Sequence, residues 1–308
     1  MMPSGGAMNA RMRRRALALG YLYGAVCVAI FSSFVLISRI GMRTDLAAPD
    51  LLALRFGIGG LILAPVLLRF GMRGTSFRDA ISLAVLGGVG FATLAYAGIA
   101  RAPATHATVF LHGTLPLSTV LIVAAYARAW PSRHRLVGIS TIAAGVAAMA
   151  WDSLENADGA QLLGDGMLFA AATLWSAYAV LARVRNVSAL HAAAFVAVLS
   201  SIIYLPVYVT LGRSNLINAS APDLMLQASF QGIVIGVVSI FAYTRATALL
   251  GATSPALLTT IVPTITTVLA IPLLGEWPSM IVAAGIVMTT MGMLIALRGI
   301  QPNEPQAG

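Results

Sequence analysis

The chain has 308 residues, of which 59% are hydrophobic and only 9% are charged. About a quarter of the residues in a soluble domain are charged, so this composition excludes a water-soluble fold. All 19 basic residues are arginines, and they separate apolar runs without forming one basic face, so the net charge of +9 does not indicate nucleic-acid binding. We therefore predict an all-α integral membrane protein.

The first apolar run follows a basic stretch, in the sequence RMRRRALALGYLYGAVCVAIFSSFVLISRI. This pattern resembles a signal peptide, but signal h-regions run for only about 7–15 residues. The run from Ala16 to Ile37 is long enough to cross a bilayer, which takes about 20 residues. We expect residues 1–16 to form a basic cytoplasmic tail and the run to be an uncleaved first helix; a cleaved signal peptide is the alternative.

Ten apolar segments in the chain are long enough to be membrane-spanning helices. The segments between them are short and leave no room for a soluble domain, and residues 299–308 form a C-terminal tail. The predicted helices cover residues 17–38, 50–69, 80–99, 103–127, 134–151, 163–182, 189–211, 228–249, 254–274 and 278–297.

The distribution of arginine predicts the orientation of these helices. A cytoplasmic N-terminus places most of the 19 arginines at cytoplasmic helix ends, as the positive-inside rule requires. Because the number of spans is even, we expect both termini in the cytoplasm and the protein in the inner (plasma) membrane. The exceptions to the charge rule are Arg39, Arg43, Arg55, Arg101 and Arg213.

The chain also contains an internal repeat. The offset that aligns Trp130 with Trp277 also aligns Gly138 with Gly285, without a gap. Each repeat contains five spans, and because five is odd the second repeat enters the membrane from the opposite side. Inverted repeats are typical of secondary transporters, where an exchange of conformations between the halves produces alternating access. Gene duplication without a mechanical consequence is the alternative. The repeats cover residues 17–151 and 163–298.

One helix, TSPALLTTIVPTITTVLAIPLLGE, resembles a known family. Its small residues at the start, Pro263 in the middle and the Gly-Glu pair at the end resemble the fourth helix of a repeat in the drug/metabolite transporter superfamily, in particular its EamA group. The first repeat keeps Pro116 but has Arg128-Ala129 in place of Gly-Glu. The resemblance implies ten transmembrane helices in two inverted five-helix repeats. It also implies export of amino acids and related metabolites, or of cationic drugs.

The resemblance further implies that the first four helices of each repeat surround a central cavity and that the fifth lies outside. The segments LVGISTIAAGVAAMA and IVAAGIVMTTMGMLIAL, which belong to helices five and ten, agree with this arrangement. They are rich in Gly and Ala and carry no charge, which suits close packing between helices. We expect the protein to be a monomer, or a homodimer that pairs through these two helices.

Polar and aromatic side chains concentrate on the helices that are expected to line the cavity. Polar groups are costly in lipid, so they should face the protein interior. For the hydroxyls the alternative is a hydrogen bond to the preceding turn of their own helix, and for the rings it is simple packing. The candidate cavity residues are Phe31, Ser32, Phe34, Arg55, Tyr96, His112, Trp175, Ser176, Tyr178, Gln231, Ser239, Tyr243, Thr259 and Thr260.

Two features bear on the substrate. Arg55 lies within the second predicted helix, where its guanidinium would bind a carboxylate through two hydrogen bonds; extension of the side chain to the membrane surface is the alternative. The first helix has Ser32 and Ser33 where a carrier of organic cations would be expected to have an embedded acid. The sequence therefore favours export of amino acids, especially aromatic and other bulky neutral ones, over multidrug efflux.

Other chemistries find little support in the sequence. His106 and His112 lack the spacing of a helical metal site, and no phosphate-binding loop motif is present. We expect no metal, no cofactor, no ATP hydrolysis and no enzymatic activity. The driving force stays undecided between facilitated export and proton antiport, for which Asp165 is the nearest acid.

Overall fold

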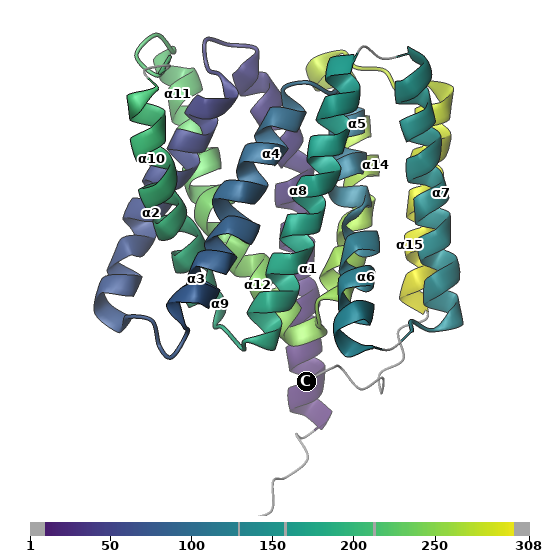
Figure 1. Cartoon of the computed structure of the whole chain (residues 1–308). Helices are drawn as coiled ribbons and strands as arrows, with labels where there is room; N and C mark the ends of the chain where they lie inside the picture. The colour runs from purple at the N-terminus through teal and green to yellow at the C-terminus, as the bar shows by residue number, and fades with distance from the viewer. Residues whose placement is uncertain (1–9, 129, 157–158, 212–213, 299–308) are drawn as a thin grey trace, which may run out of the picture.

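The computed structural model describes residues 10–128, 130–156, 159–211 and 214–298. In this part of the chain the regular structure is helical, and the long helices run side by side as one bundle (Figure 1). Eight helical segments are long and apolar enough to cross a membrane, and Met280–Ala296 is a shorter apolar one. The predicted all-α membrane fold is thus confirmed.

The first repeat forms five helical segments, and the third and fourth are each assembled from shorter pieces. Phe77–Ile99 and Ala104–Ala127 are these two composite segments. The pieces are α1 (Ala10–Met42), α2 (Ala48–Phe70), α3 (Phe77–Ala84), η1 (Val85–Val89), α4 (Gly90–Ile99), α5 (Ala104–Thr108), η2 (Val109–Gly113), α6 (Leu115–Ala127) and α7 (Arg133–Asn156).

The second repeat follows the same plan. Its second, third and fourth segments are composite: Ala189–Thr210, Ala221–Leu250 and Thr253–Leu274. The pieces are α8 (Gly159–Val184), α9 (Ala189–Ala194), η3 (Phe195–Leu199), α10 (Ser200–Thr210), α11 (Ala221–Gln227), η4 (Ala228–Ser239), α12 (Ile240–Leu250), α13 (Thr253–Leu258), η5 (Thr259–Ile261), α14 (Val262–Leu274) and α15 (Met280–Arg298).

The composite segments contain π-helical turns at η1, η2, η3 and η4. Such turns widen a helix locally and occur frequently at functional sites. At η1 the backbone leaves helical geometry at Gly88, where an added Cβ would collide with the hydroxyl of Ser200. That hydroxyl donates to Ala84 O (3.2 Å) and accepts from Val89 N (3.0 Å). A side chain of the second repeat therefore supplies hydrogen bonds to the interrupted backbone of the first.

Helices α7 and α15 pair at one edge of the bundle (Figure 1). A Cβ atom added at Gly145 would lie 2.6 Å from Gly285 O, and one added at Gly138 would lie 2.6 Å from Gly292 O. Glycine at these positions lets the two backbones approach closely, as in other membrane helix pairs. The glycine-rich faces predicted for helices five and ten are therefore used within the chain, in contact with each other.

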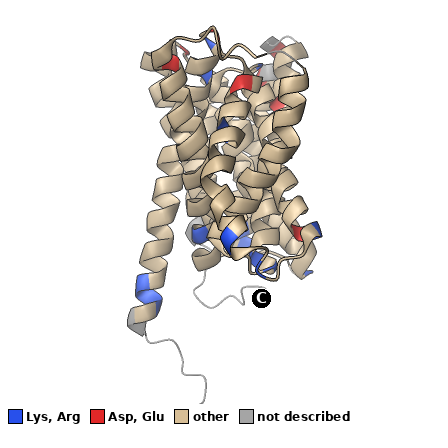
Figure 2. Cartoon of the chain, turned by 90° about the vertical axis from the view of Figure 1, so that its left-hand side faces the viewer, with Lys and Arg blue, Asp and Glu red and all other residues tan. Residues whose placement is uncertain are grey.

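Charged residues gather at the two ends of the bundle. The start of α1 projects beyond the other helices at one end, and arginines predominate there (Figures 1 and 2). Most acidic residues mark the opposite end, which we call the distal end (Figure 2). Asp45 follows the end of α1, Asp165 lies near the start of α8, and Glu276 follows the end of α14. The apolar middle and charged ends are the pattern of a protein that crosses a bilayer.

Candidate functional site

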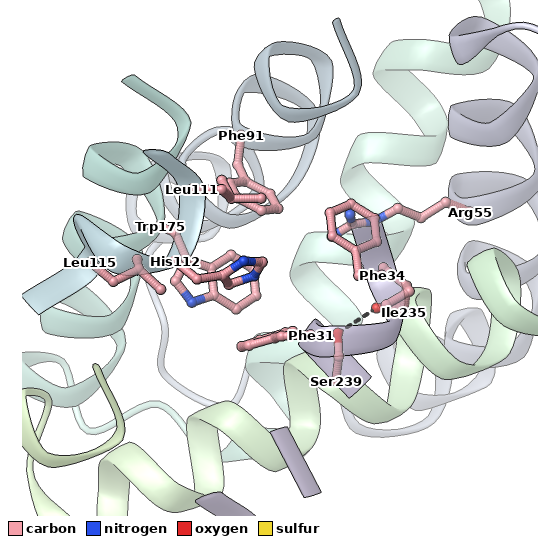
Figure 3. Close-up of a pocket in the computed structure, with 10 residues that line it drawn as sticks. All are labelled: Phe31, Phe34, Arg55, Phe91, Leu111, His112, Leu115, Trp175, Ile235 and Ser239. Atoms are coloured by element: carbon pink, nitrogen blue, oxygen red, sulfur yellow. Dashed lines mark hydrogen bonds between the residues drawn. The ribbon is translucent and has the colours of Figure 1, made fainter. Parts of the chain in front are cut away.

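A pocket, which we call the cavity, lies between the two repeats (Figure 3). Its walls come from α1, α2, α4, η2 and α6 of the first repeat and from α8 and η4 of the second. None of the lining residues belongs to α7 or α15. They are Phe31, Phe34, Arg55, Phe91, Leu111, His112, Leu115, Trp175, Ile235 and Ser239.

Aromatic rings form one wall of the cavity around Trp175. The centre of its ring lies 4.7 Å from that of Phe91, 5.3 Å from that of Tyr243 and 6.1 Å from that of Phe31. Phe31 in turn stacks on the imidazole of His112, with ring centres 5.2 Å apart. Edge-to-face and offset ring contacts are favourable beyond the apolar area they bury, so this wall suits a ligand with an aromatic or bulky apolar group.

Arg55 supplies the positive charge of the cavity and enters it from α2, away from Trp175 and His112 (Figure 3). The residue is 1% exposed, so it does not extend to the end of its helix. The guanidinium carbon lies 5.5 Å from the ring centre of Phe91 and 5.8 Å from that of Phe56. Nε and Nη1 have no hydrogen-bond partner, and the polar side chain next to the guanidinium is the neutral Tyr96.

No carboxylate forms an ion pair with Arg55 in the part of the chain that the structure describes. A buried charge without a partner destabilises a protein by several kcal/mol, and this cost falls when an opposite charge arrives with good geometry. His112 also presents a nitrogen, Nδ1, that lacks a hydrogen-bond partner. The cavity therefore offers unsatisfied polar groups, one of them charged, to a ligand.

Six of the predicted cavity residues lie on the cavity wall, and three predicted tyrosines lie behind it. Tyr96 packs its ring on Phe34 (5.3 Å between centres), Tyr178 on Trp175 (5.2 Å) and Tyr243 on Phe31 (5.9 Å). The six on the wall are Phe31, Phe34, Arg55, His112, Trp175 and Ser239.

The five remaining predicted residues do not line this cavity. Ser32 and Thr259 donate to Val28 O and Ala256 O of their own helices, which is the back-bonding alternative. The other three are buried elsewhere. Ser176 accepts a hydrogen bond from Thr119 (3.0 Å), Gln231 accepts one from the hydroxyl of Tyr96 (2.6 Å), and Thr260 is fully buried.

Four lining residues were not predicted from the sequence: Phe91, Leu111, Leu115 and Ile235. Two of them carry a usable signal, because Leu115 lies about one helical turn after His112 and Ile235 lies one helical turn before Ser239. Phe91 carries none, since an apolar ring in an apolar helix looks the same whether it faces lipid, core or cavity.

An ion cluster lies at the distal end. Glu276 Oε1 pairs with Arg39 (2.8 Å) and Arg43 (3.2 Å), and Glu276 Oε2 accepts a hydrogen bond from Ala104 N (2.6 Å). Arg39 also donates to the carbonyl of Ile99 (3.1 Å). The cluster thus joins the end of α1 and the start of α5, both in the first repeat, to the end of α14 in the second repeat.

Asp165, the acid considered for proton coupling, is buried near the same end of the bundle. Its Oδ2 lies 3.4 Å from His106 Nδ1, and His106 Nε2 lies 3.7 Å from Asp152 Oδ2. Neither Asp165 nor His106 lines the cavity.

Comparisons with known proteins agree with this architecture. A family model described as "EamA-like transporter family" matches residues 18–151 and 162–298, one match in each half of the chain. A solved structure described as "Crystal structure of protein" is 19% identical, with a TM-score of 0.61 over 90% of this chain and 96% of that one. At that identity the likeness shows the fold alone. No curated protein matches the chain.

Proposed function

Because the chain belongs to the EamA-like transporter family, within the drug/metabolite transporter superfamily, we propose that it exports amino acids and related metabolites. Transport proceeds by alternating access, in which the two repeats exchange conformations around the cavity between them. Among the amino acids, aromatic and other bulky neutral ones are the favoured substrates. The observation that carries this proposal is a buried Arg55, without a carboxylate partner, in a cavity lined mainly by aromatic and aliphatic side chains.

The chemistry of the cavity supports such a substrate at two points. A guanidinium binds a carboxylate through two parallel hydrogen bonds, which fixes orientation as well as charge. The rings of Phe31, Phe91 and Trp175 then offer stacking partners for the substrate side chain. Each ring pair contributes about 0.5–1.5 kcal/mol beyond area burial. These contacts tolerate a range of apolar side chains, so we expect a broad substrate range.

Multidrug or organic-cation efflux is the alternative within the superfamily, and no observation favours it. The cavity lining contains an arginine and no acid, so it repels a cation and offers it no counter-charge. The proposal includes no enzymatic activity, because the cavity-lining residues include no nucleophile paired with a base and no paired acids.

The membrane setting is part of the proposal. The arginine-rich end with the start of α1 lies in the cytoplasm, and the acid-rich distal end lies outside the inner membrane (Figure 2). Both termini are then cytoplasmic. The protein acts as a monomer, or as a homodimer through the faces of α7 and α15 that point away from each other.

Counterflow into proteoliposomes tests this function. We expect the purified protein to exchange phenylalanine and other bulky neutral amino acids but not ethidium. Replacing His112, Tyr96 or Tyr243 with Ala should reduce the flux while leaving the gel-filtration profile unchanged, whereas Tyr126→Ala, at a side chain that is 56% exposed, should leave both unchanged. Transport of ethidium without transport of any amino acid would refute the proposal in favour of drug efflux.

A further inference from the structure

The charges around the cavity are unbalanced, and this imbalance bears on the class of substrate. Among the lining residues Arg55 is positive, and none can carry negative charge. The groups packed on the guanidinium are the rings of Phe56 and Phe91 and the neutral Tyr96. An empty cavity therefore holds one uncompensated positive charge in a buried setting.

A zwitterion does not remove this imbalance. In an α-amino acid the ammonium and the carboxylate are attached to the same carbon, so a carboxylate bound to Arg55 brings its ammonium within a few ångströms of the guanidinium. The acceptors on the wall are neutral: Ser239 Oγ, which already donates to Ile235 O, and His112 Nδ1. The two cations repel each other at low local dielectric, and the occupied cavity keeps its net charge of +1.

An anion with the same ring and no ammonium matches the cavity better. Its carboxylate neutralises Arg55, its ring packs on the aromatic wall, and no second cation enters. We propose that the cavity selects aromatic carboxylates with a net charge of −1, such as 2-hydroxy or 2-oxo acids, over the amino acids of the same shape. This inference rests on the proposed function, since it concerns the same cavity and the same export, and it names the preferred class among the related metabolites.

The preference has a consequence for the driving force. Export of a monoanion moves negative charge out of the cell, so an inside-negative membrane potential drives it without a coupled proton. In the outward step of the transport cycle the substrate-loaded cavity is neutral. In the return step the empty cavity carries the positive charge of Arg55 back toward the cytoplasmic side. A potential of 100 mV corresponds to an outward gradient of about 50-fold for one charge. An embedded acid for proton antiport is then unnecessary.

Three matched compounds test the inference in proteoliposomes: L-3-phenyllactate, L-phenylalanine and L-phenylalaninol. They share one ring and one carbon skeleton and carry net charges of −1, 0 and +1. We expect phenyllactate to exceed phenylalanine in kcat/KM by at least about tenfold, a difference that one additional favourable charge interaction supplies. Phenylalaninol should not be carried. A potassium diffusion potential, inside negative, should accelerate phenyllactate efflux, with leak through protein-free liposomes subtracted.

Variants assign the effect to Arg55. Arg55→Gln should abolish the preference for phenyllactate over phenylalanine, whereas Arg78→Gln, at an exposed residue at the start of α3, should leave that preference unchanged. If Arg55→Gln does not fold, the three compounds on the unmodified protein decide the question alone.

The outcomes separate the two proposals. Equal or faster transport of phenylalanine, without a response to potential, overturns the inference and leaves amino-acid export standing. Transport of phenylalaninol alone, or of none of the three compounds, overturns both.

Discussion

The close contact between α7 and α15 predicts how much stability a single methyl group removes. A Cβ atom at Gly145 would lie 2.6 Å from Gly285 O, and ordinary contact begins at 3.4 Å, so the helices must separate by about 0.8 Å. The atom in the way is backbone and cannot rotate aside. Overpacking of this kind costs about 1–3 kcal/mol. The higher helix propensity of alanine offsets about 1 kcal/mol of this cost.

A second glycine-to-alanine variant serves as a control for the gain in helix propensity. Gly166 lies within α8, and a Cβ added there meets no atom within 4 Å. Gly166→Ala gains the same propensity without the overpacking, so the difference between it and Gly145→Ala isolates the contact at about 1–3 kcal/mol. Thermal unfolding in detergent, followed by gel filtration after heating, measures it. At about 2–4 °C per kcal/mol, Gly145→Ala should have a Tm several degrees lower than Gly166→Ala. Equal Tm values would refute the reasoning.

Three further predictions concern polar contacts and orientation. Glu276→Gln removes the distal ion pairs and should cost about 1–3 kcal/mol in the free energy of unfolding, visible as a lower Tm; an unchanged Tm would show that the cluster is not stabilising. Tyr96→Phe leaves Gln231 Oε1 without its donor and should cost about 1–3 kcal/mol, while Tyr126→Phe should cost nothing measurable. Reporter fusions after Gly308 should read cytoplasmic, and a periplasmic signal would reverse the proposed topology.

Apolar run length predicted which segments are helical but not where the helices begin. The sixth and eighth helices were predicted to begin at 163 and 228, and they begin at Gly159 and Ala221. The start of the eighth helix is set by its N-cap residue, because Ser220 accepts a hydrogen bond from Asp223 N. The helix therefore begins more than one turn before the apolar run. Hydropathy does not register such a cap.

The cavity was predictable only where its lining is polar or lies one helical turn from a polar residue. Arg55, His112 and Ser239 stand out in apolar helices because each is costly in lipid. Phe91 does not stand out, although it contacts both the guanidinium of Arg55 and the ring of Trp175. The hydroxyls were overestimated, because many of them are satisfied by their own helix, as Thr259 is. The π-helical turns have no sequence signature at all.

The glycine contacts of α7 and α15 have a symmetry of their own. Under the repeat, Gly138 corresponds to Gly285 and Gly145 to Gly292, so exchanging the repeats converts the Gly138–Gly292 contact into the Gly145–Gly285 contact. This is the property of an isologous dimer interface. A single five-helix unit would carry a face that fits a second copy of itself inserted upside down. Fusion into one chain makes that pairing independent of concentration, and it leaves each copy free to diverge elsewhere, as the unmatched Glu276 has.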